Sequence, residues 1–526
     1  MVRAASRGTG TGRIVKRILL TSCILTGLGL GGCAVGPDFK KPAAPAASRY
    51  GQAGQPDRTQ AVTGKAEQLA AGLQGGAQAL HPGQDIPAQW WTLFHSPALD
   101  QLVRKAIDNN PSLEAARDAL AAAQENRLAQ QSALYPSISG SFNPTRNKTS
   151  RTYSPVPNSN QWLYTVHTAQ LNISYVPDLW GGVRRGVEAA KALRDAQRDQ
   201  LRAVYLTLTS SVVQAAIDYA TLKTQLETTQ SLVALQRNLL ESARKQEKAG
   251  EFSQNDVALQ RTALAQNEAT LAPLQKQLEQ QKHLIASLVG DSPDAPQPEF
   301  SLNDLTLPAD LPVSLPARLV EQRPDIRTAQ ANWHAACAQV GVAVANRLPN
   351  IQLGATPGFA AASIAQMAAP GYGQWEVMAM VTQPLFDGGL LRHQEHAARA
   401  AYDQAAADYR TTLITALQDV ADSLTAIRTD ATALADNAEA ATAAGDSLRI
   451  ALAQYRYGAI SQVVMLTTQQ AHLQTELALA QARADRLSDT VALFQSLGGG
   501  WWNSTESDAP HHPSWHPDKG LSVLLP

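Results

Sequence analysis

The chain has 526 residues, with 44 Lys and Arg against 45 Asp and Glu, and its formal net charge at pH 7 is −1. Such a balance gives no electrostatic case for a nucleic-acid partner. The three cysteines, Cys23, Cys33 and Cys337, are too few for a disulfide framework or a multi-cysteine zinc site.

The N-terminus has the form of a targeting segment. A basic region from Arg13 to Arg17 precedes an apolar stretch, Ile18 to Leu30, that is too short for an ordinary membrane span. The stretch ends in Leu-Gly-Gly-Cys, the form of a bacterial lipoprotein signal. We therefore predict that residues 1–32 are a signal peptide and that Cys33 is lipidated. Ala34 follows instead of an aspartate, which favours outer-membrane sorting; an ordinary secretory signal is the alternative.

The first part of the mature chain is dominated by Ala, Gly, Gln and Pro. We predict that residues 33–85 form a lipid anchor and a tether with little capacity to build a core. Order is expected to resume at Ile86, in the element Trp90-Trp91-Thr92-Leu93-Phe94. A helix is then expected from about Pro97 to Leu134, with Pro111 early in it.

Two segments with strand character follow, at Tyr135 to Asn143 and Gln161 to Val176. In the second, the apolar positions change from one face of the strand to the other along its length. This change of phase implies either a bulge or a change of environment. The residues concerned are Trp162, Tyr164 and Val166 on one face and Leu171, Ile173 and Tyr175 on the other.

Two long stretches contain almost no helix breakers. Val187 to Ala249 has neither glycine nor proline, and Leu390 to Tyr457 is interrupted only by Gly445. Apolar residues recur in both at alternating steps of four and three, typical of left-handed coiled coils. One apolar column of the first stretch fades at Thr229 and Gln236. At about 1.5 Å per residue, each helix would be roughly 95–100 Å long.

Each long helix is expected to end in a tight turn and to return. Gly250 is placed to cap the first helix, and Ser253 to begin its return helix, which contains Pro273 as an expected kink. Gly458 and Ser461 are placed in the same way after the second long helix.

The chain duplicates this whole pattern. Adding 208 to Gly250 gives Gly458, and short motifs recur in order: Asn110-Pro111 with Arg323-Pro324, Tyr135-Pro136 with Leu348-Pro349, and Pro177–Gly182 with Pro384–Gly389. We predict repeats at 86–291 and 316–500, joined by a linker at 292–315 and followed by a polar tail at 501–526. The third and fourth strands are expected near Ile351 to Phe359 and Gln374 to Leu385. In the fourth, Trp375, Val377, Ala379 and Val381 alternate as a lipid-facing set would.

The predicted fold is mostly α, with antiparallel coiled-coil hairpins and a small β part of four strands per chain. Four strands cannot close a membrane barrel, and an open edge in lipid costs several kcal/mol per unpaired backbone group. A membrane barrel must therefore be shared, and two copies with eight strands or three with twelve are both allowed. The alternative is that soluble hairpins cap a coiled coil.

The motifs resemble those of a known family. The segment Cys33–Pro42 is similar to the start of mature NodT-type outer-membrane efflux lipoproteins of the TolC/OprM family. The Trp90–Phe94 element, the duplicated strand starts and the Gly-Gly-Gly-Trp ending also resemble that family, over nearly the whole mature chain. The stretch from Gly51 to Gln84 departs from it. The resemblance implies a homotrimer with a twelve-stranded outer-membrane β-barrel, surrounded by outer-membrane lipid, and a periplasmic tunnel of twelve helices.

The resemblance also implies partners and sites. The partners are a periplasmic adaptor protein and an inner-membrane RND-type pump, with docking at the tips through Gly250, Ser253, Gly458 and Ser461. Family members commonly carry constriction aspartates on the second return helix. This chain has Val464 and Thr467 there, so an acidic constriction would come instead from Asp256, which matches Val464 in the first repeat.

We find no phosphate-binding glycine loop and no nucleophile elbow, so neither an enzyme nor a cofactor is expected. His393 and His396 lie three residues apart, but they lack a third ligand for a metal. The predicted function is a passive exit duct of a tripartite RND-type efflux pump, carrying small toxic compounds or drugs. The alternatives are a duct for type I protein secretion and a periplasmic coiled-coil scaffold lipoprotein, although a scaffold leaves the duplicated strands unexplained.

Overall fold

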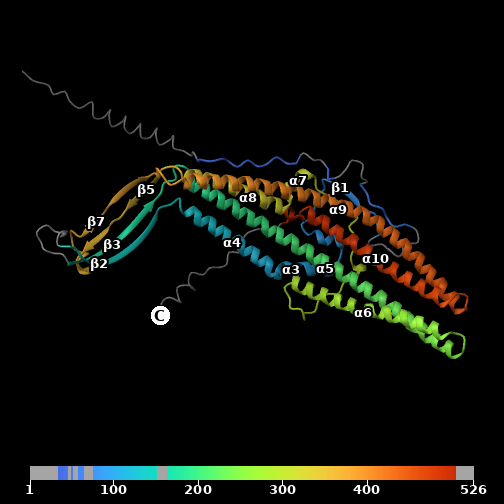
Figure 1. Ribbon diagram of the computed structural model, residues 1–526. Helices are drawn as coiled ribbons and strands as arrows, with labels where there is room; N and C mark the ends of the chain where they lie inside the picture. Colours follow the sequence, from blue (N-terminus) through green and yellow to red (C-terminus); the bar gives the residue numbers. More distant parts are fainter. Residues whose placement is uncertain (1–33, 46–48, 51–56, 64–74, 151–162, 505–526) are drawn as a thin grey trace, which may run out of the picture. The chain divides into compact units, whose positions relative to one another are not determined.

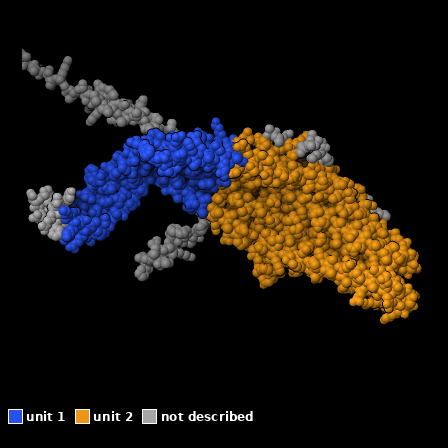
Figure 2. All heavy atoms as spheres, viewed as in Figure 1, with its two compact units in different colours: residues 1–41, 122–195, 331–407 blue, residues 42–121, 196–330, 408–526 orange. Residues whose placement is uncertain are grey.

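The computed structural model describes residues 34–45, 49–50, 57–63, 75–150 and 163–504 (Figure 1). Cys33, the predicted signal peptide and residues 505–526 lie outside the described residues. The chain divides into two compact units (Figure 2). Unit 1 comprises residues 1–41, 122–195 and 331–407, and unit 2 comprises residues 42–121, 196–330 and 408–526.

The two predicted long helices are confirmed, and each has 67 residues. Each is followed by a return helix of 35 residues, and the helix before each strand pair has 22. These equal lengths, in the same order, agree with the predicted duplication. The helices are α4 (Pro111–Ser132), α5 (Gly182–Lys248), α6 (Gln254–Leu288), α8 (Pro324–Ala345), α9 (Leu390–Arg456) and α10 (Gln462–Ser496).

None of the helices among the described residues has the length and apolar character needed to cross a membrane.

The prediction of one helix from Pro97 to Leu134 is wrong. The structure has α3 (Pro97–Asn109) and α4, separated at Asn110, whose backbone is extended at φ −71° and ψ 121°. A residue before proline is pushed out of the helical region by the proline ring, which explains the break. The Asn110 side chain then donates a hydrogen bond of 2.8 Å to the carbonyl of Leu288, the last residue of α6.

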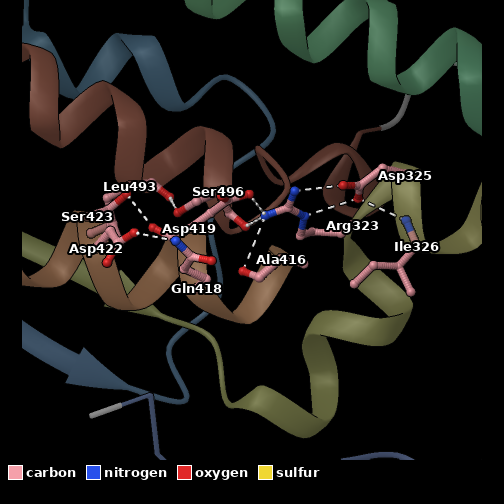
Figure 3. A network of polar contacts seen from close by, with 10 residues as sticks. All are labelled: Arg323, Asp325, Ile326, Ala416, Gln418, Asp419, Asp422, Ser423, Leu493 and Ser496. Atoms are coloured by element: carbon pink, nitrogen blue, oxygen red, sulfur yellow. Dashed lines mark hydrogen bonds and ion pairs between the residues drawn. The ribbon is translucent and has the colours of Figure 1, made fainter. Parts of the chain in front are cut away.

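Arg323 follows α7 (Pro316–Gln322) and has the corresponding role in the second repeat (Figure 3). Its guanidinium donates to the carboxylates of Asp325 and Asp419 at 2.6 and 2.9 Å, and to the carbonyl of Ser496 at 3.2 Å. Ser496 ends α10, so Arg323 and Asn110 each satisfy a carbonyl left without an intrahelical partner at the end of a return helix. Burial lowers the pKa of Arg323 and the two carboxylates raise it, with a net upward shift.

The element predicted at Trp90–Phe94 is a short 3-10 helix, and its aromatic residues are buried in unit 2. The Trp90 ring lies 5.4 Å from the ring of Phe494 on α10. Ile86 is also fully buried, so the ordered packing predicted to be present at Ile86 is confirmed.

Unit 1 contains an antiparallel sheet. Its strands are β2 (Ser137–Lys148), β3 (Leu163–Tyr175), β5 (Asn350–Ala355), β6 (Gly358–Ala361), β7 (Gly373–Gln374) and β8 (Val377–Thr382). The predicted third strand is thus divided into β5 and β6, which keep one register against β3. The division falls at Pro357, which has no N–H to donate, although its carbonyl accepts from Leu171 N at 2.9 Å. The predicted fourth strand is likewise divided into β7 and β8 without a change of register.

The bulge considered for the second strand is absent from its pairing with β2, which runs without interruption from Ser137 opposite Ser174 to Lys148 opposite Leu163. The uninterrupted register places Tyr164 and Val166 on the opposite face of β3 from Leu171 and Ile173.

The expectation that order resumes only at Ile86 is wrong. Within the described residues, β1 (Ala79–Pro82) pairs in parallel with β4 (Asp310–Val313) in unit 2. Little in the amino-acid pattern indicates this pair, because each strand has only four residues and contains a proline.

The tether also contributes to the core of unit 2. Val62 packs in a buried cluster with Leu434, Ala438, Ala441, Leu479 and Ala482, which belong to α9 and α10. Arg486 on α10 is fully buried, and its guanidinium donates to Thr59 Oγ1 at 3.0 Å and to the carbonyl of Gly76 at 2.7 Å. A low average hydrophobicity therefore concealed a few side chains that lie against the second helical hairpin.

Candidate functional site

The strand register sorts the side chains of the unit 1 sheet into an apolar face and a polar face. The apolar face carries Ile138, Phe142, Leu171, Ile173, Leu353, Phe359, Trp375, Val377 and Val381. The opposite face is mostly polar and carries Ser139, Ser141, Asn143, Gln170, Asn172, Ser174, Gln352 and Thr382, although Tyr164, Val166, Met378 and Met380 also lie on it.

The apolar face is exposed in the single chain. The exposed fractions are 78% for Trp375, 71% for Val377 and 66% for Val381, and Ala379 beside them is also exposed. These four residues are the predicted lipid-facing set. A sheet that is apolar outside and polar inside matches the pattern of a transmembrane barrel wall.

The sheet has two open edges within the described residues. β2 is paired on one side, with β3, and β8 is paired on one side, with β5. Backbone groups along an edge must find partners if the sheet lies in lipid. The sheet in one chain is therefore incomplete as a membrane structure.

The two long helices end in the same turn. Gly250 has φ 80° and Gly458 has φ 66°, the left-handed region that favours glycine. In the first turn, Gly250 N donates to Glu247 O and Glu251 N to Gln246 O, both at 2.9 Å. The corresponding bonds around Gly458 are 3.0 and 2.9 Å. Both are Schellman motifs, so the predicted glycine caps are confirmed.

The return helices begin with the predicted serine caps, but the two caps differ. Ser253 Oγ accepts from Asp256 N at 3.2 Å, and the Asp256 carboxylate accepts from Ser253 N and Oγ at 3.2 and 2.7 Å. Ser461 Oγ accepts from Val464 N at 3.4 Å, with no carboxylate at the equivalent position. Asp256 thus completes a capping box that the second hairpin lacks.

Both turns face open space. A Cβ added at Gly250 or Gly458 would meet no heavy atom within 4 Å. Tyr457, beside the second turn, is 89% exposed. A partner could therefore approach either turn from its end.

The candidate constriction residues lie on separate helices. Asp256 is half-buried near the start of α6, whereas Val464 and Thr467 are exposed near the start of α10. The pKa of Tyr455 is raised first by burial and then by the negative charge of Asp256. Asp256 therefore lies close enough to the end of α9 to affect it electrostatically.

A buried amide network joins the two hairpins close to the turns. Gln236 on α5 donates to Gln469 Oε1 on α10 at 3.4 Å, and it accepts from Asn267 on α6 at 3.0 Å. Gln260 donates to the backbone carbonyl of Gln236 at 3.3 Å. All four side chains are buried. This network was not predicted from the sequence, in which its only signal is the fading of the apolar column at Gln236.

The network continues toward the ends of the helices. Gln462 donates to Gln260, and the hydroxyl of Tyr455 donates to Gln462. The rings of Tyr455 and Phe252 meet edge to face at 6.2 Å. Buried amides of this kind fix the register between helices, because any shift leaves polar groups unsatisfied.

His393 and His396 lie with their rings 6.2 Å apart. The described residues contain no group of three or more His, Cys, Asp and Glu side chains arranged to hold a metal ion.

A family model described as outer membrane efflux protein matches residues 102–291 and 315–499. The chain belongs to the outer membrane efflux protein family. It is accordingly an outer-membrane component of efflux, and the family is one of transport channels.

Its similarity to characterised members of this family extends over most of the chain. The toluene efflux pump outer membrane protein TtgC of Pseudomonas putida is 28% identical over 92% of this chain and 96% of its own length. The pyoverdine export outer membrane protein OpmQ, also of Pseudomonas putida, is 29% identical over 81% of this chain and 90% of its own.

Solved structures of outer membrane efflux proteins give the same picture. The outer-membrane channel OprN has a TM-score of 0.77 at 25% identity, covering 89% of this chain and all of that one. The outer membrane protein VceC of Vibrio cholerae has a TM-score of 0.73 at 27% identity, covering 79% and 100%.

Proposed function

We propose that this chain is the passive exit duct of a tripartite RND-type efflux pump. It receives small toxic compounds or drugs from a periplasmic adaptor and an inner-membrane pump and releases them outside the cell. The main support is the sheet, which has one apolar face, one polar face and two open edges. A wall of this kind suits a water-filled pore in lipid. We assign the chain no catalytic role.

The assembly that we propose is a homotrimer. The chain supplies the equivalent of four barrel strands. These are β2, β3, β5 continued by β6, and β7 continued by β8, since each divided strand keeps one register. Three copies would close a twelve-stranded barrel, in which β2 of one chain pairs with β7 and β8 of the next. Outer-membrane lipid would then cover the apolar face.

The adaptor is proposed to dock at the turns formed by Gly250 with Ser253 and by Gly458 with Ser461. Three chains would present six such turns, and all of them would end in solvent-exposed glycines. The candidate constriction is at Asp256, Val464 and Thr467, although the capping role of Asp256 already accounts for its carboxylate.

Type I protein secretion would use the same fold. Efflux of small compounds is favoured because the similar proteins are named for toluene efflux, antibiotic efflux and pyoverdine export. We also propose that Cys33 is lipidated and that the mature chain begins there.

Native mass spectrometry of the protein extracted from outer membranes tests this assembly. The expected particle contains three chains, each beginning at an acylated Cys33. A stable single chain with a folded sheet would contradict the proposal, because its two sheet edges would stand unpaired in the membrane.

A further inference from the structure

A cavity of about 360 Å³ lies in unit 1. Most of its lining residues come from the junctions of β3 with α5 and of α8 with β5, and these elements can be followed in Figure 1. Its volume is within the range of about 300–1,000 Å³ that is usual for small-ligand pockets. Apolar side chains make up much of its wall, including those of Val176, Leu179, Trp180, Val342, Leu348 and Ile351. The polar side chains of Gln130, Asp178, Asn346 and Asn350 also line it. Neither the exit duct nor the adaptor contacts account for this cavity.

The first described residues of the mature chain are held beside the cavity. Val35 N donates to the carbonyl of Trp180 at 2.9 Å, and Trp180 lines the cavity. Arg185 on α5 donates through Nε to the carbonyl of Val35 at 3.2 Å and through its terminal nitrogen to Asp38 at 2.6 Å. The ring of Phe39 stacks on His334 of α8 with centroids 4.5 Å apart.

Glycines allow this close approach. A Cβ at Gly181 would lie 2.5 Å from Ala34 Cα, and a Cβ at Gly36 would lie 2.4 Å from Gly341 Cα. Gly181 precedes the lining residue Gly182, and Gly341 precedes the lining residue Val342. The segment Ala34–Gly36 therefore runs along the rim of the cavity.

The equivalent corner of the second repeat has no such cover. Phe386 and Asp387 correspond to Leu179 and Trp180, and both are exposed, Phe386 to 93%. Leu179 and Trp180 are only 39% and 38% exposed. The side chains at the strand–helix junction are therefore less exposed in the first repeat, where the N-terminal segment packs, than in the second.

We infer that this cavity is a binding site for a fatty acyl chain and that its occupant is an acyl chain carried by Cys33. The inference rests on the lipidation that forms part of the proposed function. Cys33 is the residue next to Ala34 in the sequence, so a lipid that it carries would be attached one peptide unit, about 3.8 Å between Cα atoms, from this segment. The site would hold the anchor against the protein as well as in the bilayer, fixing the depth at which the sheet sits.

Cells can be fed a diazirine-bearing fatty acid that enters both lipoprotein anchors and phospholipids. After irradiation, the purified full-length protein is digested and its cross-linked peptides are identified by mass spectrometry. The expected cross-links join the acylated Cys33 peptide to peptides containing Val342, Leu348 or Ile351. Cross-links at these residues that carry a phospholipid mass would overturn the choice of occupant, and no cross-links there would overturn the site.

Val342→Phe fills the cavity and is expected to abolish the cavity cross-links. Val344→Phe is the matched control, because it adds the same bulk to α8 outside the cavity lining and should leave them unchanged. If Val342→Phe reduces the amount of protein, Val183→Phe blocks the cavity from α5 instead. Cross-links that persist in a folded filling variant would contradict the inference.

The same cells separate this inference from the proposed function. Loss of export with the cross-links intact would count against the duct and leave the site standing. Normal export with an unacylated Cys33 would overturn the site and leave the duct standing.

Discussion

The turn at Gly458 offers a direct test of the docking surface. Its φ of 66° lies in the left-handed region, where a residue with a Cβ costs about 1–2 kcal/mol. A Cβ there would meet no heavy atom within 4 Å, so the indole of Gly458→Trp would project into solvent. The cost is small beside a folding free energy of about 5–15 kcal/mol, so the trimer should still assemble. A partner approaching the end of the hairpin would meet the added bulk.

The matched control is Gly458→Ala, which has a similar backbone cost and almost no added bulk. We expect Gly458→Trp to abolish export and adaptor cross-linking, whereas Gly458→Ala retains both. The assays are drug susceptibility, trimer abundance in outer membranes and cross-linking to the adaptor. If the tryptophan variant exports and cross-links normally, the turn is not the docking surface. Equal losses in both variants would attribute the effect to the backbone of the turn.

Three further variants test the core, a titrating group and the lipid-facing surface. Leu434→Ala should cost about 2–5 kcal/mol in denaturant unfolding, since this fully buried side chain packs against the tether; a loss well below 1 kcal/mol would contradict that packing. The pKa of Asp430 is raised from its ordinary value of 3.8 to about 7, first by burial and then by its side-chain hydrogen bond with Asp489. The protonated carboxyl therefore contributes stability that is present below about pH 4 and is lost as the pH rises through about 7. Asp430→Asn removes this titration, so it should flatten the fall in Tm between about pH 5 and about pH 8. An unchanged slope of Tm against pH would refute this. Trp375→Arg should cost up to about 2–4 kcal/mol, according to its depth in the bilayer, and reduce outer-membrane trimer, whereas Gln374→Arg on the polar face should not; equal effects would reverse the assignment of the faces.

The long helices and their turns could be predicted because their signals are local. The heptad columns and the glycine–serine spacing are set by residues close in sequence, and the helices at 182–248 and 390–456 follow the predicted ones closely. The apolar alternation of Trp375, Val377, Ala379 and Val381 likewise placed them on one face before any pairing was known.

Other features depend on contacts that a linear pattern does not contain. The β1–β4 pair joins short segments more than 200 residues apart, and proline-rich composition concealed it. The amide network brings residues of α5, α6, α9 and α10 together, so Gln236 alone appeared only as a gap in a heptad column. The constriction could not be located from one chain, because Asp256 and Val464 occupy equivalent positions on different hairpins.

Dye efflux from living cells tests most directly whether this chain is an export duct. A Gram-negative host without its own outer-membrane ducts would receive the cognate adaptor and pump, with or without this chain, and be loaded with a fluorescent pump substrate. We expect energised cells to expel the dye rapidly only when the chain is present, and we expect Gly458→Trp to abolish this gain. Equal efflux with and without the chain, while the adaptor, the pump and the trimer are all present, would contradict this expectation.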